Sequence, residues 1–399
     1  MKQILIIGGG YGGLKCAIKL QKKLKNKDVK VTLVSKHDYH YQTTLLHKVA
    51  VGTYSARKAR MFYRILLNKV EFIKDTIENI DINTKTVKGV RACYNYDYLV
   101  IAAGFRVNDF KILGVKEYTH KISTINDALK IRQSIENKFK NFPYKPNEND
   151  LSFAVCGSGF TGVEFAAELA ERTEALCKIS GVDKSLVKVY LIGRGKHILP
   201  MFNEKLSAIA RDKLNKLGVR YIKGNVVECE KDGVIIENQN GLRRKIYANT
   251  ILWSAGVKGN PLISRSNIPN KNNRIEVNKF LQMPNNPEVF VIGDCAIANE
   301  RDIIHAPTAQ LASQMGEYCA NNLIKLVNNK NLDKGFHFIH RGTVCSITHT
   351  DGVGVAYGMN ISGEIAAFLK NFIENRWIIS IANLATVFRK GQFRFRSSD

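Results

Sequence analysis

The sequence has few of the residues that define several large classes of protein. Its 399 residues include only 8 prolines, 8 cysteines and 2 tryptophans, too few for a collagen-like chain or a small disulfide-bonded scaffold. No two cysteines have CxxC or CxxxxC spacing, which argues against a zinc site and against a redox-active dithiol. Scattered single thiols are typical of a reducing compartment, and no metal is expected.

Long apolar runs and acidic residues are also scarce. No uncharged apolar run reaches the roughly 18 residues that a membrane-spanning helix needs, and the apolar run after Gln3 is too short for the core of a signal peptide. The 60 basic against 35 acidic residues give a net charge of +25, which favours anionic partners. We therefore expect a protein that is cytosolic or held on a membrane surface without crossing it.

What the sequence does contain is a repeat. A GxGxxG motif occurs twice, each time after a short apolar run and before an amphipathic segment, and a second apolar run follows at 29–34 and again at 187–192. In such a unit the first glycine makes a tight bend, the second admits a pyrophosphate, and the third lets helix and strand pack closely. The alternative is a pair of glycine turns without ligands. The motif glycines are Gly8, Gly10 and Gly13, then Gly157, Gly159 and Gly162.

Further apolar runs predict strands at 97–101, 249–252 and 288–292. Small residues or a carboxylate follow each of these runs, as is usual where a chain passes close to a bound nucleotide. A polar stretch at 141–150 is interpreted as a linker, and the chain from about 335 is strand-like at 339–347, Gly-rich at 352–358 and then helical. The residues after the strands are Ala103, Gly104, Ala255, Gly256 and Asp294.

Neither unit carries the acidic residue that commonly ends the second strand and binds a ribose. Ser35 and Lys36 stand there in the first unit, and Gly193 and Arg194 in the second. Ser35 can bond a ribose hydroxyl, and Lys36 can face a phosphate. A missing carboxylate removes repulsion against a 2′-phosphate, which Arg194 could bind; a solvated surface arginine is the alternative.

Two polar patterns are candidates for the chemistry. A helix is expected from about Pro307, and it places Gln310 and Gln314 on one face among small residues, a face that can lie flat against a planar ring. Two solvated glutamines are the alternative. Glu164 is expected in the first turn of the second helix, where the helix dipole favours an acid even without a catalytic role.

The C-terminal residues 365–388 have apolar positions at helical spacing, together with Trp377. Basic residues flank them, so we expect a helix that lies in the interface of an anionic membrane; a core helix or a dimer contact is the alternative. The basic residues are Lys370, Arg376, Arg389, Lys390, Arg394 and Arg396.

Taken together, these motifs resemble the two-dinucleotide-binding flavoproteins, and within them closely the type II, non-proton-pumping NADH:quinone oxidoreductases. The resemblance runs over nearly the whole chain. It rests on GGGYGG (8–13), HYQTTLLH (40–47), GSGFTGVEFAAEL (157–169), LPMF (199–202), WSAG (253–256), VIGDCA (291–296), TAQLASQMG (308–316) and RGTVCS (341–346).

The resemblance implies an α/β fold with two Rossmann-like domains and a C-terminal membrane-associating region. The expected bounds are 1–112 with 265–330 for the FAD domain, 113–264 for the NAD(P)H domain and 331–399 for the C-terminal region. It also implies a peripheral enzyme on the cytoplasmic face of the cell membrane, within a respiratory chain. FAD would pass electrons from NADH to a membrane quinone.

The resemblance further implies roles for particular residues. Glu164, Gln310 and Gln314 would be catalytic, with the two glutamines meeting the quinone. The cofactor-binding positions would be Gly8, Gly9, Gly10, Tyr11, Gly12, Gly13, Ser35, Lys36, Thr44, Ile77, Ala103, Gly104, Gly157, Gly159, Phe160, Gly162, Arg194, Ala255, Gly256, Asp294, Thr308, Ala309 and Lys370.

Several alternatives stay open at this stage. Gly193 stands where this family carries a nucleotide-selecting glutamate, so NADPH is an alternative donor and a soluble protein an alternative acceptor. A non-catalytic nucleotide-binding regulator is a third alternative. The net charge of +25 also suggests a nucleic-acid-binding protein, but RNA-binding aromatic motifs, a helix-turn-helix and a zinc signature are all missing, so no nucleic acid partner is expected. A homodimer stays open.

Overall fold

The computed structural model describes the whole chain except residues 26–27, 301–302 and 394–399. The chain forms two compact units. Unit 1 comprises Met1–Gln42, Arg60–Arg106 and Val257–His340, and unit 2 comprises Thr43–Ala59, Val107–Gly256 and Arg341–Asp399. These bounds differ from the expected domains, because residues 43–59 and the segment from Arg341 pack within unit 2.

Unit 1 is built on a six-stranded sheet in the order β20-β21-β9-β1-β2-β5. Strand β1 pairs in parallel with β2 on one side and β9 on the other, and its last residue, Ile7, lies level with Val34 and Ile101. The chain leaves all three strands at one edge, where the strand order reverses, and such an edge is where α/β folds bind ligands. The strands are β1 (Lys2–Ile7), β2 (Val29–Ser35), β5 (Glu71–Lys74), β9 (Tyr98–Ile101), β20 (Gln282–Met283) and β21 (Asn286–Val291).

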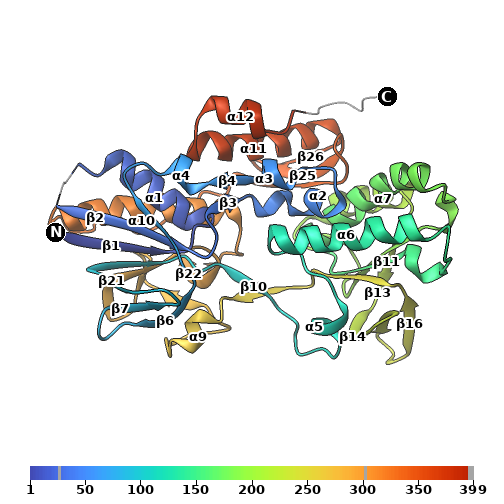
Figure 1. Ribbon diagram of the computed structural model, residues 1–399, viewed down its shortest axis with the longest axis horizontal. Coiled ribbons are helices and arrows are strands. Elements are labelled where there is room, and N and C mark those ends of the chain that lie inside the picture. Colours follow the sequence, from blue (N-terminus) through green and yellow to red (C-terminus); the bar gives the residue numbers. More distant parts are fainter. Residues whose placement is uncertain (26–27, 301–302, 394–399) are drawn as a thin grey trace. The chain divides into compact units, whose positions relative to one another are not determined.

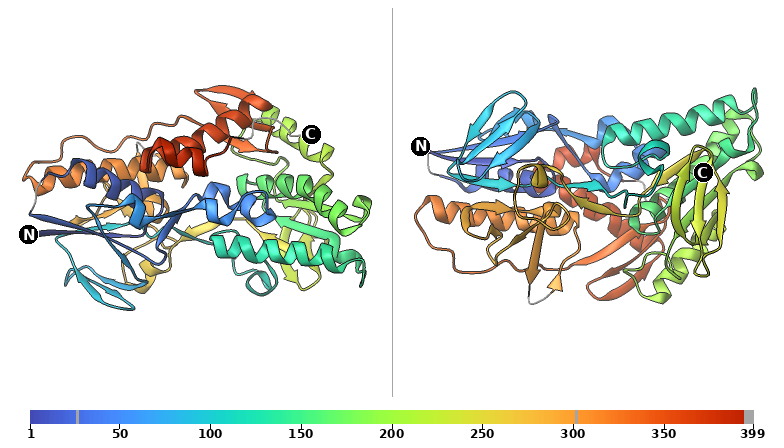
Figure 2. Two further views of the ribbon diagram at one scale, coloured as in Figure 1. Left: turned by 45° about the horizontal axis from the view of Figure 1, so that its top comes forward. Right: turned by 90° about the horizontal axis from the view of Figure 1, so that it is seen from below.

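Helices α1 (Tyr11–Lys23) and α10 (Ala309–Val327) lie side by side in unit 1 (Figures 1 and 2). The apolar side chains of the sheet, among them Leu5, Ile7 and Val34, form its core. The smaller elements of unit 1 are β3 (Tyr39–Tyr41), β4 (Arg60–Phe62), α4 (Tyr63–Leu66), β6 (Ile77–Asp81), β7 (Thr86–Gly89), β8 (Cys93–Asn95), β18 (Val257–Gly259), α9 (Leu262–Arg265), β19 (Ile275–Val277), η4 (Gly293–Cys295), β22 (Ala296–Glu300) and β23 (Ile303–Ile304), with β10 (Phe105–Val107) paired to β18.

Unit 2 repeats this plan with a four-stranded parallel sheet in the order β13-β12-β11-β17. Cys156, at the end of β11, lies level with Ile192 and with Trp253, so these strands also end at one edge. The strands are β11 (Ser152–Cys156), β12 (Lys188–Gly193), β13 (Val219–Lys223) and β17 (Thr250–Trp253), and the helices are α6 (Ile125–Asn141), α7 (Phe160–Ser180) and α8 (Glu204–Lys216). The sheet core includes Ala154, Ile192 and Ile251.

The remaining elements of unit 2 include two antiparallel sheets and the C-terminal helices, drawn in red in Figure 1. They are η1 (Thr43–Leu45), α2 (Leu46–Val51), α3 (Ala56–Ala59), α5 (Val115–Tyr118), η2 (Glu148–Leu151), η3 (Lys184–Leu186), β14 (Asn225–Glu230), β15 (Gly233–Glu237), β16 (Arg243–Tyr247), β24 (Gly342–Ser346), β25 (Gly352–Ala356), β26 (Met359–Ser362), α11 (Glu364–Ile381) and α12 (Leu384–Lys390). Within the described residues, none of the helices is long and apolar enough to span a membrane.

The expected α/β fold with two Rossmann-like sheets is confirmed, and each strand predicted from an apolar run is present within one or two residues. The Gly-rich stretch contributes strand β25, in which Gly352 and Gly354 lie close against the backbone of β24. One local interpretation differs from the structure. The polar linker is shorter than expected, because α6 extends to Asn141 and η2 begins at Glu148.

Candidate functional site

The glycines of the first turn differ in the space around them. Gly8 has φ +99°, a conformation that side chains rarely adopt, and a Cβ there would overlap the carbonyl oxygen of Ala102. A Cβ at Gly13 would overlap the carbonyl oxygen of Gly8, whereas a Cβ at Gly10 would have no atom within 4 Å. The first and third glycines therefore hold strand and helix together, and the second faces open space.

The second turn has the same arrangement. Gly157 has φ +121° and lies against Ser254, a Cβ at Gly162 would overlap the carbonyl oxygen of Gly157, and Gly159 faces open space. Helices α1 and α7 both begin at the second glycine, and neither has a side chain that caps its first N–H groups. Both turns thus form a cradle: an open glycine beside helix N–H groups that are left for an anion.

The other residues of the first turn pack within unit 1. The Gly9 carbonyl accepts a hydrogen bond from the Tyr63 hydroxyl at 2.7 Å and lies 3.0 Å from His40 Nδ1. Tyr11 places its ring edge against His40, with the ring centroids 5.2 Å apart. Gly12 lies against α10, where a Cβ would come within 3.2 Å of the Ala312 carbonyl oxygen. Gly9 and Gly12 therefore fix the backbone of the turn through contacts with neighbouring elements of unit 1.

Strand ends in unit 1 supply the expected polar groups. Ser35 ends β2 partly buried, and Lys36 is exposed beside it. Asp294 lies in η4, just after β21, and burial raises the pKa of its carboxyl group although Arg274 acts against the shift. No described residue donates a hydrogen bond to this carboxylate, so it can accept bonds from the hydroxyls of a polyol. With Gly104 also facing open space, the edge fits a flavin dinucleotide.

Two of the expected cofactor positions, Ile77 and Thr308, have structural roles. Ile77 is 8% exposed within the core of unit 1, so only its backbone could reach a ligand. Thr308 is the N-cap of α10, and its hydroxyl accepts a hydrogen bond from the Leu311 N–H at 3.1 Å. The helix that was expected from about Pro307 begins two residues later, at Ala309, because Thr308 is its N-cap. Ala309 is the first helical residue, and Thr44 lies in η1 of unit 2.

The small residues of α10 do not form the flat face that the sequence suggested. A Cβ at Gly316 would overlap the Gly12 carbonyl oxygen, so Gly316 and Ala312 pack against α1. Gln314 exchanges two hydrogen bonds with the backbone of Ile339, donating at 2.9 Å and accepting at 3.0 Å. Gln310 is partly buried one turn earlier. The close approach of α1 and α10 therefore explains why Ala312 and Gly316 are small.

Unit 2 has its own small residues at the strand ends. Ala255 is exposed after β17, and Gly256 follows it with the Phe110 ring above, so that a Cβ there would come within 2.7 Å of that ring. Phe160 begins α7 and packs edge-on against Phe202. Arg194, after β12, is exposed. The structure thus places all the unit 2 nucleotide candidates at the edge that holds Gly159.

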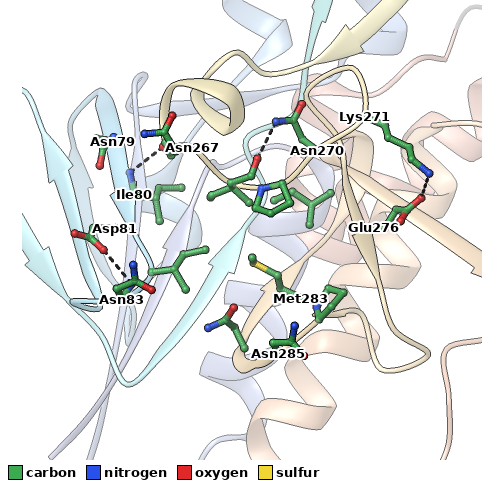
Figure 3. A pocket seen from close by; sticks show the side chains of 17 residues that line it. Asn79, Ile80, Asp81, Asn83, Asn267, Asn270, Lys271, Glu276, Met283 and Asn285 are labelled. Carbon is green, nitrogen blue, oxygen red and sulfur yellow. Dashed lines mark hydrogen bonds and ion pairs between the residues drawn. The ribbon is translucent and has the colours of Figure 1, made fainter.

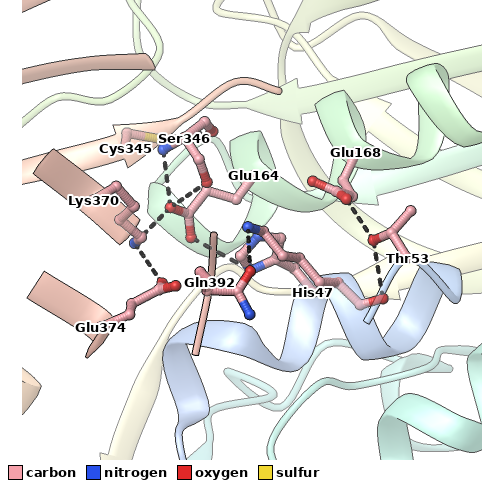
Figure 4. Close-up of polar contacts among 10 residues, drawn as sticks. His47, Thr53, Glu164, Glu168, Cys345, Ser346, Lys370, Glu374 and Gln392 are labelled. Atoms are coloured by element: carbon pink, nitrogen blue, oxygen red, sulfur yellow. Dashed lines mark hydrogen bonds and ion pairs between the residues drawn. The ribbon is translucent and has the colours of Figure 1, made fainter. Parts of the chain in front are cut away.

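Glu164 is in a different environment from the expected one. The first turn of α7 contains no acid, and Glu164 lies beyond it with only 5% of its surface exposed. Its Oε1 accepts hydrogen bonds from Lys370 Nζ at 2.8 Å, from the Ser346 N–H at 3.1 Å and from the Ser346 hydroxyl at 3.0 Å (Figure 4). The helix dipole therefore does not account for an acid at this position. The hydrogen bonds from Lys370 and Ser346 do.

Electrostatics keep Glu164 and Lys370 ionised although both are buried. Burial acts to raise the pKa of Glu164, but the Lys370 ammonium and the Ser346 hydrogen bonds outweigh it, so the pKa lies below its usual value. Burial acts to lower the pKa of Lys370, but Glu164 and Glu374 outweigh it and raise that pKa. Glu164 and Lys370 therefore form an ion pair that is shielded from water, and Oε1 of Glu164 accepts further hydrogen bonds from Ser346.

Glu374 completes what we call the buried charged cluster, which consists of the buried His47, Lys48, Glu164, Glu168 and Glu374 together with Lys370, whose side chain is 12% exposed. Figure 4 labels all of these residues except Lys48. Glu374 Oε1 lies 3.9 Å from Lys370 Nζ. Burial raises the pKa of Glu374 to about 7, although Lys48 and Lys370 act against the shift. With Glu374 protonated, two lysines balance two glutamates, whereas its ionisation leaves one excess negative charge in the cluster.

His47 is the member of the cluster that faces Glu164 from α2. Its Nδ1 lies 3.7 Å from Glu164 Oε2, and its Nε2 has no hydrogen-bond partner among the described residues. Burial lowers the pKa of His47, so the ring is neutral near neutral pH. The sequence motif at 40–47 contained this histidine, but nothing local identified it, Lys48 or Glu374 as partners of Glu164, because these contacts join segments that are far apart in the chain.

The C-terminal segment differs from the single helix that was expected. It breaks between α11 and α12, because Asn383 caps the second helix. The prediction of Trp377 on a membrane face was wrong, since Trp377 is 9% exposed and packs within unit 2 together with Ile378. Lys370 points into the buried charged cluster, and Arg394 and Arg396 lie outside the described residues. Large apolar side chains are nevertheless exposed: Ile365, Phe368, Phe372, Ile373, Ile379, Leu384, Phe388 and Phe393.

A hollow of about 830 Å³ lies in unit 1 away from the glycine turn (Figure 3). Several asparagines line it, but two of them already bond to backbone carbonyls: the Asn79 side chain donates to the carbonyl of Arg265, at the end of α9, and that of Asn270 to the nearby Ile268 carbonyl. All eight cysteines are free, and no cluster of metal-ligating residues occurs in the described part of the chain. The strand edges therefore stay the candidate sites.

Comparison with known proteins agrees with this geometry. The family model for pyridine nucleotide-disulphide oxidoreductases matches residues 2–316. The type II NADH:quinone oxidoreductase of Staphylococcus epidermidis strain ATCC 12228 is 37% identical, covering 98% of this chain and 99% of that protein. The protein of the same name from Staphylococcus aureus strain NCTC 8325 is 36% identical over the same shares.

Two solved structures share the fold. The Plasmodium falciparum NDH2 in complex with NADH has a TM-score of 0.86 at 20% identity, covering 99% of this chain and all of that one. The sulfide:quinone oxidoreductase of Aquifex aeolicus has a TM-score of 0.79 at 22% identity, covering 98% and 94%. With full-length relatives above one third identity, the chain belongs to the type II NADH:quinone oxidoreductase family and is an oxidoreductase that uses FAD as cofactor and a nicotinamide nucleotide as substrate.

Proposed function

We propose that this protein transfers electrons from NADH through FAD to a membrane quinone, at the membrane surface and without pumping protons. The observation that carries the proposal is the pair of equivalent glycine cradles, one in each unit, in a chain with full-length relatives of that name. FAD bound in unit 1 would supply the redox chemistry that links a hydride donor to a quinone. The protein supplies binding, orientation and protons.

In the proposal, unit 1 holds FAD. The open side of Gly10 and the uncapped N-terminus of α1 receive the pyrophosphate, Ser35 and Lys36 receive the adenosine end, and the Asp294 carboxylate accepts hydrogen bonds from the ribityl chain. The N-terminus of α10, at Thr308 and Ala309, faces the isoalloxazine ring. Thr44 and Lys370 stay predictions as flavin contacts.

Unit 2 holds the nicotinamide nucleotide in the same way. Gly159 and the N-terminus of α7 receive its pyrophosphate, and Ala255 and Gly256 allow the chain to pass close to it. The exposed Phe110 ring above Gly256 is a side chain that can move to admit the nucleotide. Two separate cradles let the electron donor bind without displacing the flavin.

The buried charged cluster has the chemistry needed to handle protons. Reduction of a quinone to a quinol consumes two protons, and a group that exchanges a proton near neutral pH serves this best. Glu374, with its pKa raised to about 7 by burial, holds a proton at its carboxyl group, next to Lys370 Nζ. Glu164 accepts hydrogen bonds from Lys370 and Ser346 at one oxygen, and we assign it a part in this proton exchange within unit 2.

Gln310 and Gln314 are assigned to the quinone. Gln314 reaches it only by exchanging its two hydrogen bonds to Ile339 for bonds to the ligand. The segment before Arg341 would then move with quinone binding.

The exposed apolar side chains of α11 and α12 are assigned to the membrane. Ile365, Phe368, Phe372 and Ile379 follow one face of α11, and the rings of Phe388 and Phe393 stack at the end of α12, 5.9 Å apart. Exposed Arg376 and Arg389 lie among them. A helix face of this kind inserts shallowly into an anionic bilayer.

The electron transfer is tested by following the flavin in the purified protein. The protein is expected to be yellow, to lose its flavin absorbance when NADH is added without oxygen, and to regain it when a quinone follows. Bleaching without recovery would replace the quinone by another acceptor, and a colourless protein would contradict the proposal as a whole.

Membrane binding is tested separately by sedimentation with vesicles that contain phosphatidylglycerol. We expect the F368S/F372S double variant to bind at least about 100-fold more weakly, because each phenylalanine loses about 1.5–3 kcal/mol of apolar burial. The matched control is L242S/Y247S, which removes exposed apolar side chains near β16. Equal binding of both variants would assign the membrane contact to another surface.

A further inference from the structure

An acidic residue at the end of strand β12, of the kind that usually binds an adenosine ribose, would require neighbouring side chains to shift. Gly193 is buried there, and a Cβ at this position would overlap the Ser158 hydroxyl and come within 3.0 Å of the Tyr221 hydroxyl. Ser158 belongs to the glycine turn itself. The absence of a carboxylate is therefore part of the packing of this cradle, and not a single exchange on an open surface.

Positive charge gathers around the same strand end. Arg194 and Lys196 follow Gly193 and are both exposed, and Lys223 is the residue that pairs with Gly193 across the sheet. The guanidinium carbon of Arg211 lies 5.9 Å from the ring centre of Tyr221, whose hydroxyl donates to the Gly195 carbonyl at 2.6 Å.

The four basic side chains at this strand end are not neutralised by carboxylates of the described residues. Within the described part of the chain, none of Arg194, Lys196, Arg211 and Lys223 forms an ion pair. The nearby Glu204 carboxylate lies 3.1 Å from His197 Nε2 instead.

The residue that ends the second strand of a dinucleotide unit decides how the ribose is recognised. A carboxylate there accepts hydrogen bonds from the 2′-hydroxyl and repels a 2′-phosphate, whereas an arginine beside it binds that phosphate. A guanidinium suits this role, because its donors match two phosphate oxygens at once. Unit 2 lacks the carboxylate and has the arginine.

We propose that the nucleotide cradle of unit 2 also binds NADPH. Arg194 binds the 2′-phosphate, and the positive charges of Lys196 and Lys223 attract it. The inference rests on the proposed function, because it extends the range of electron donors at the same site. Arg194 is a specificity-determining residue in this account, and hydride transfer itself does not depend on it.

The first test measures binding without turnover. The FAD-loaded full-length protein is titrated in a calorimeter with adenosine 2′,5′-bisphosphate and with adenosine 3′,5′-bisphosphate, which has the same charge but a different phosphate position. We expect the 2′,5′ isomer to bind about tenfold more tightly. R194Q should abolish this preference, and R244Q, which removes an exposed arginine on β16, should keep it.

The second test measures kcat/KM with NADPH and with NADH. For the wild type we expect the two values within about tenfold of each other. R194Q should lower the NADPH value about tenfold more than it lowers the NADH value, and R194E should lower the NADPH value further. A matching unfolding temperature for R194Q and wild type ensures that the comparison concerns binding.

Failure of this inference and failure of the proposed function look different. Equal binding of the two bisphosphates, or an NADPH value that R194Q does not change, overturns the inference while NADH-driven quinone reduction can stand. The opposite outcome is also possible to recognise. If the protein prefers the 2′,5′ isomer through Arg194 but reduces no quinone, the inference stands and the proposed function is overturned.

Discussion

The two glycine cradles have the same backbone arrangement where they would hold a pyrophosphate, but the residues that surround them differ. In both, the first and third glycines leave no space for a Cβ and the second leaves open space. Beside them, Gly9 of unit 1 is held by Tyr63 and His40, whereas Ser158 of unit 2 lies against Gly193. The comparison teaches that the triplet identifies a dinucleotide site, and that the neighbouring strand end determines which dinucleotide it accepts.

The largest expected effect separates the two cradles by function. G13A should purify without flavin, because its Cβ overlaps the Gly8 carbonyl oxygen, whereas G162A should stay yellow but lose NADH oxidation by more than about 100-fold. Flavin absorbance per protein and the rate with NADH measure the two effects. G10A and G159A separate packing from binding: their Cβ atoms meet open space, so both variants should keep the wild-type unfolding temperature and weaken only the binding of the ligand in their own cradle. Loss of flavin from G162A would contradict the assignment.

The next effect tests the buried ion pair between Glu164 and Lys370 of unit 2. K370M should lower the free energy of unfolding by about 3–5 kcal/mol, because it leaves the Glu164 charge buried and unpaired. The double variant E164Q/K370M should recover most of this loss. Urea unfolding of the three proteins is the measurement, and a double variant no more stable than K370M would show that the lysine acts mainly through packing.

A smaller effect depends on pH. The pKa of Glu374 is raised to about 7 in the folded protein, so the folded state binds the extra proton, and its stability falls as pH rises from the unfolded pKa through that value. E374Q keeps the neutral form at every pH. It should therefore be about 1–3 kcal/mol more stable than wild type near pH 8, and nearly equal to it near pH 5. Thermal unfolding across this range checks the slope, and an equal gain at both ends would exclude titration as the cause.

The smallest effect concerns the helix that carries its own cap. Thr308 caps α10, whereas α1 and α7 begin at glycines without side-chain caps. T308A should cost about 1 kcal/mol of stability, and T308S should restore most of it. Flavin content should change little in either variant. A loss of flavin in T308A that T308S restores would mean that the hydroxyl contacts the cofactor.

Much of the fold could be predicted, because its signals are local. The apolar runs before Gly8 and Gly157 predicted buried strands, and the glycine spacing itself requires the strand–turn–helix geometry. The buried charged cluster could not be predicted, since Glu164, Ser346 and Lys370 are brought together from distant parts of the chain. Periodicity also misplaced Trp377, because α11 is apolar on both its buried and its exposed sides. Small residues in α10 suit a planar ring and a neighbouring helix equally well, and only the packing against Gly12 distinguishes the two.

The C-terminal segment supplies Ser346 and Lys370, the groups that neutralise Glu164 on α7. A version of the protein shortened before Arg341 would leave a bare carboxylate inside unit 2, so cutting off the tail is a poor route to an enzyme that needs no detergent. Exchanging Phe368, Phe372 and their exposed apolar neighbours for polar residues, one surface position at a time, would detach the protein from lipid and leave its interior intact.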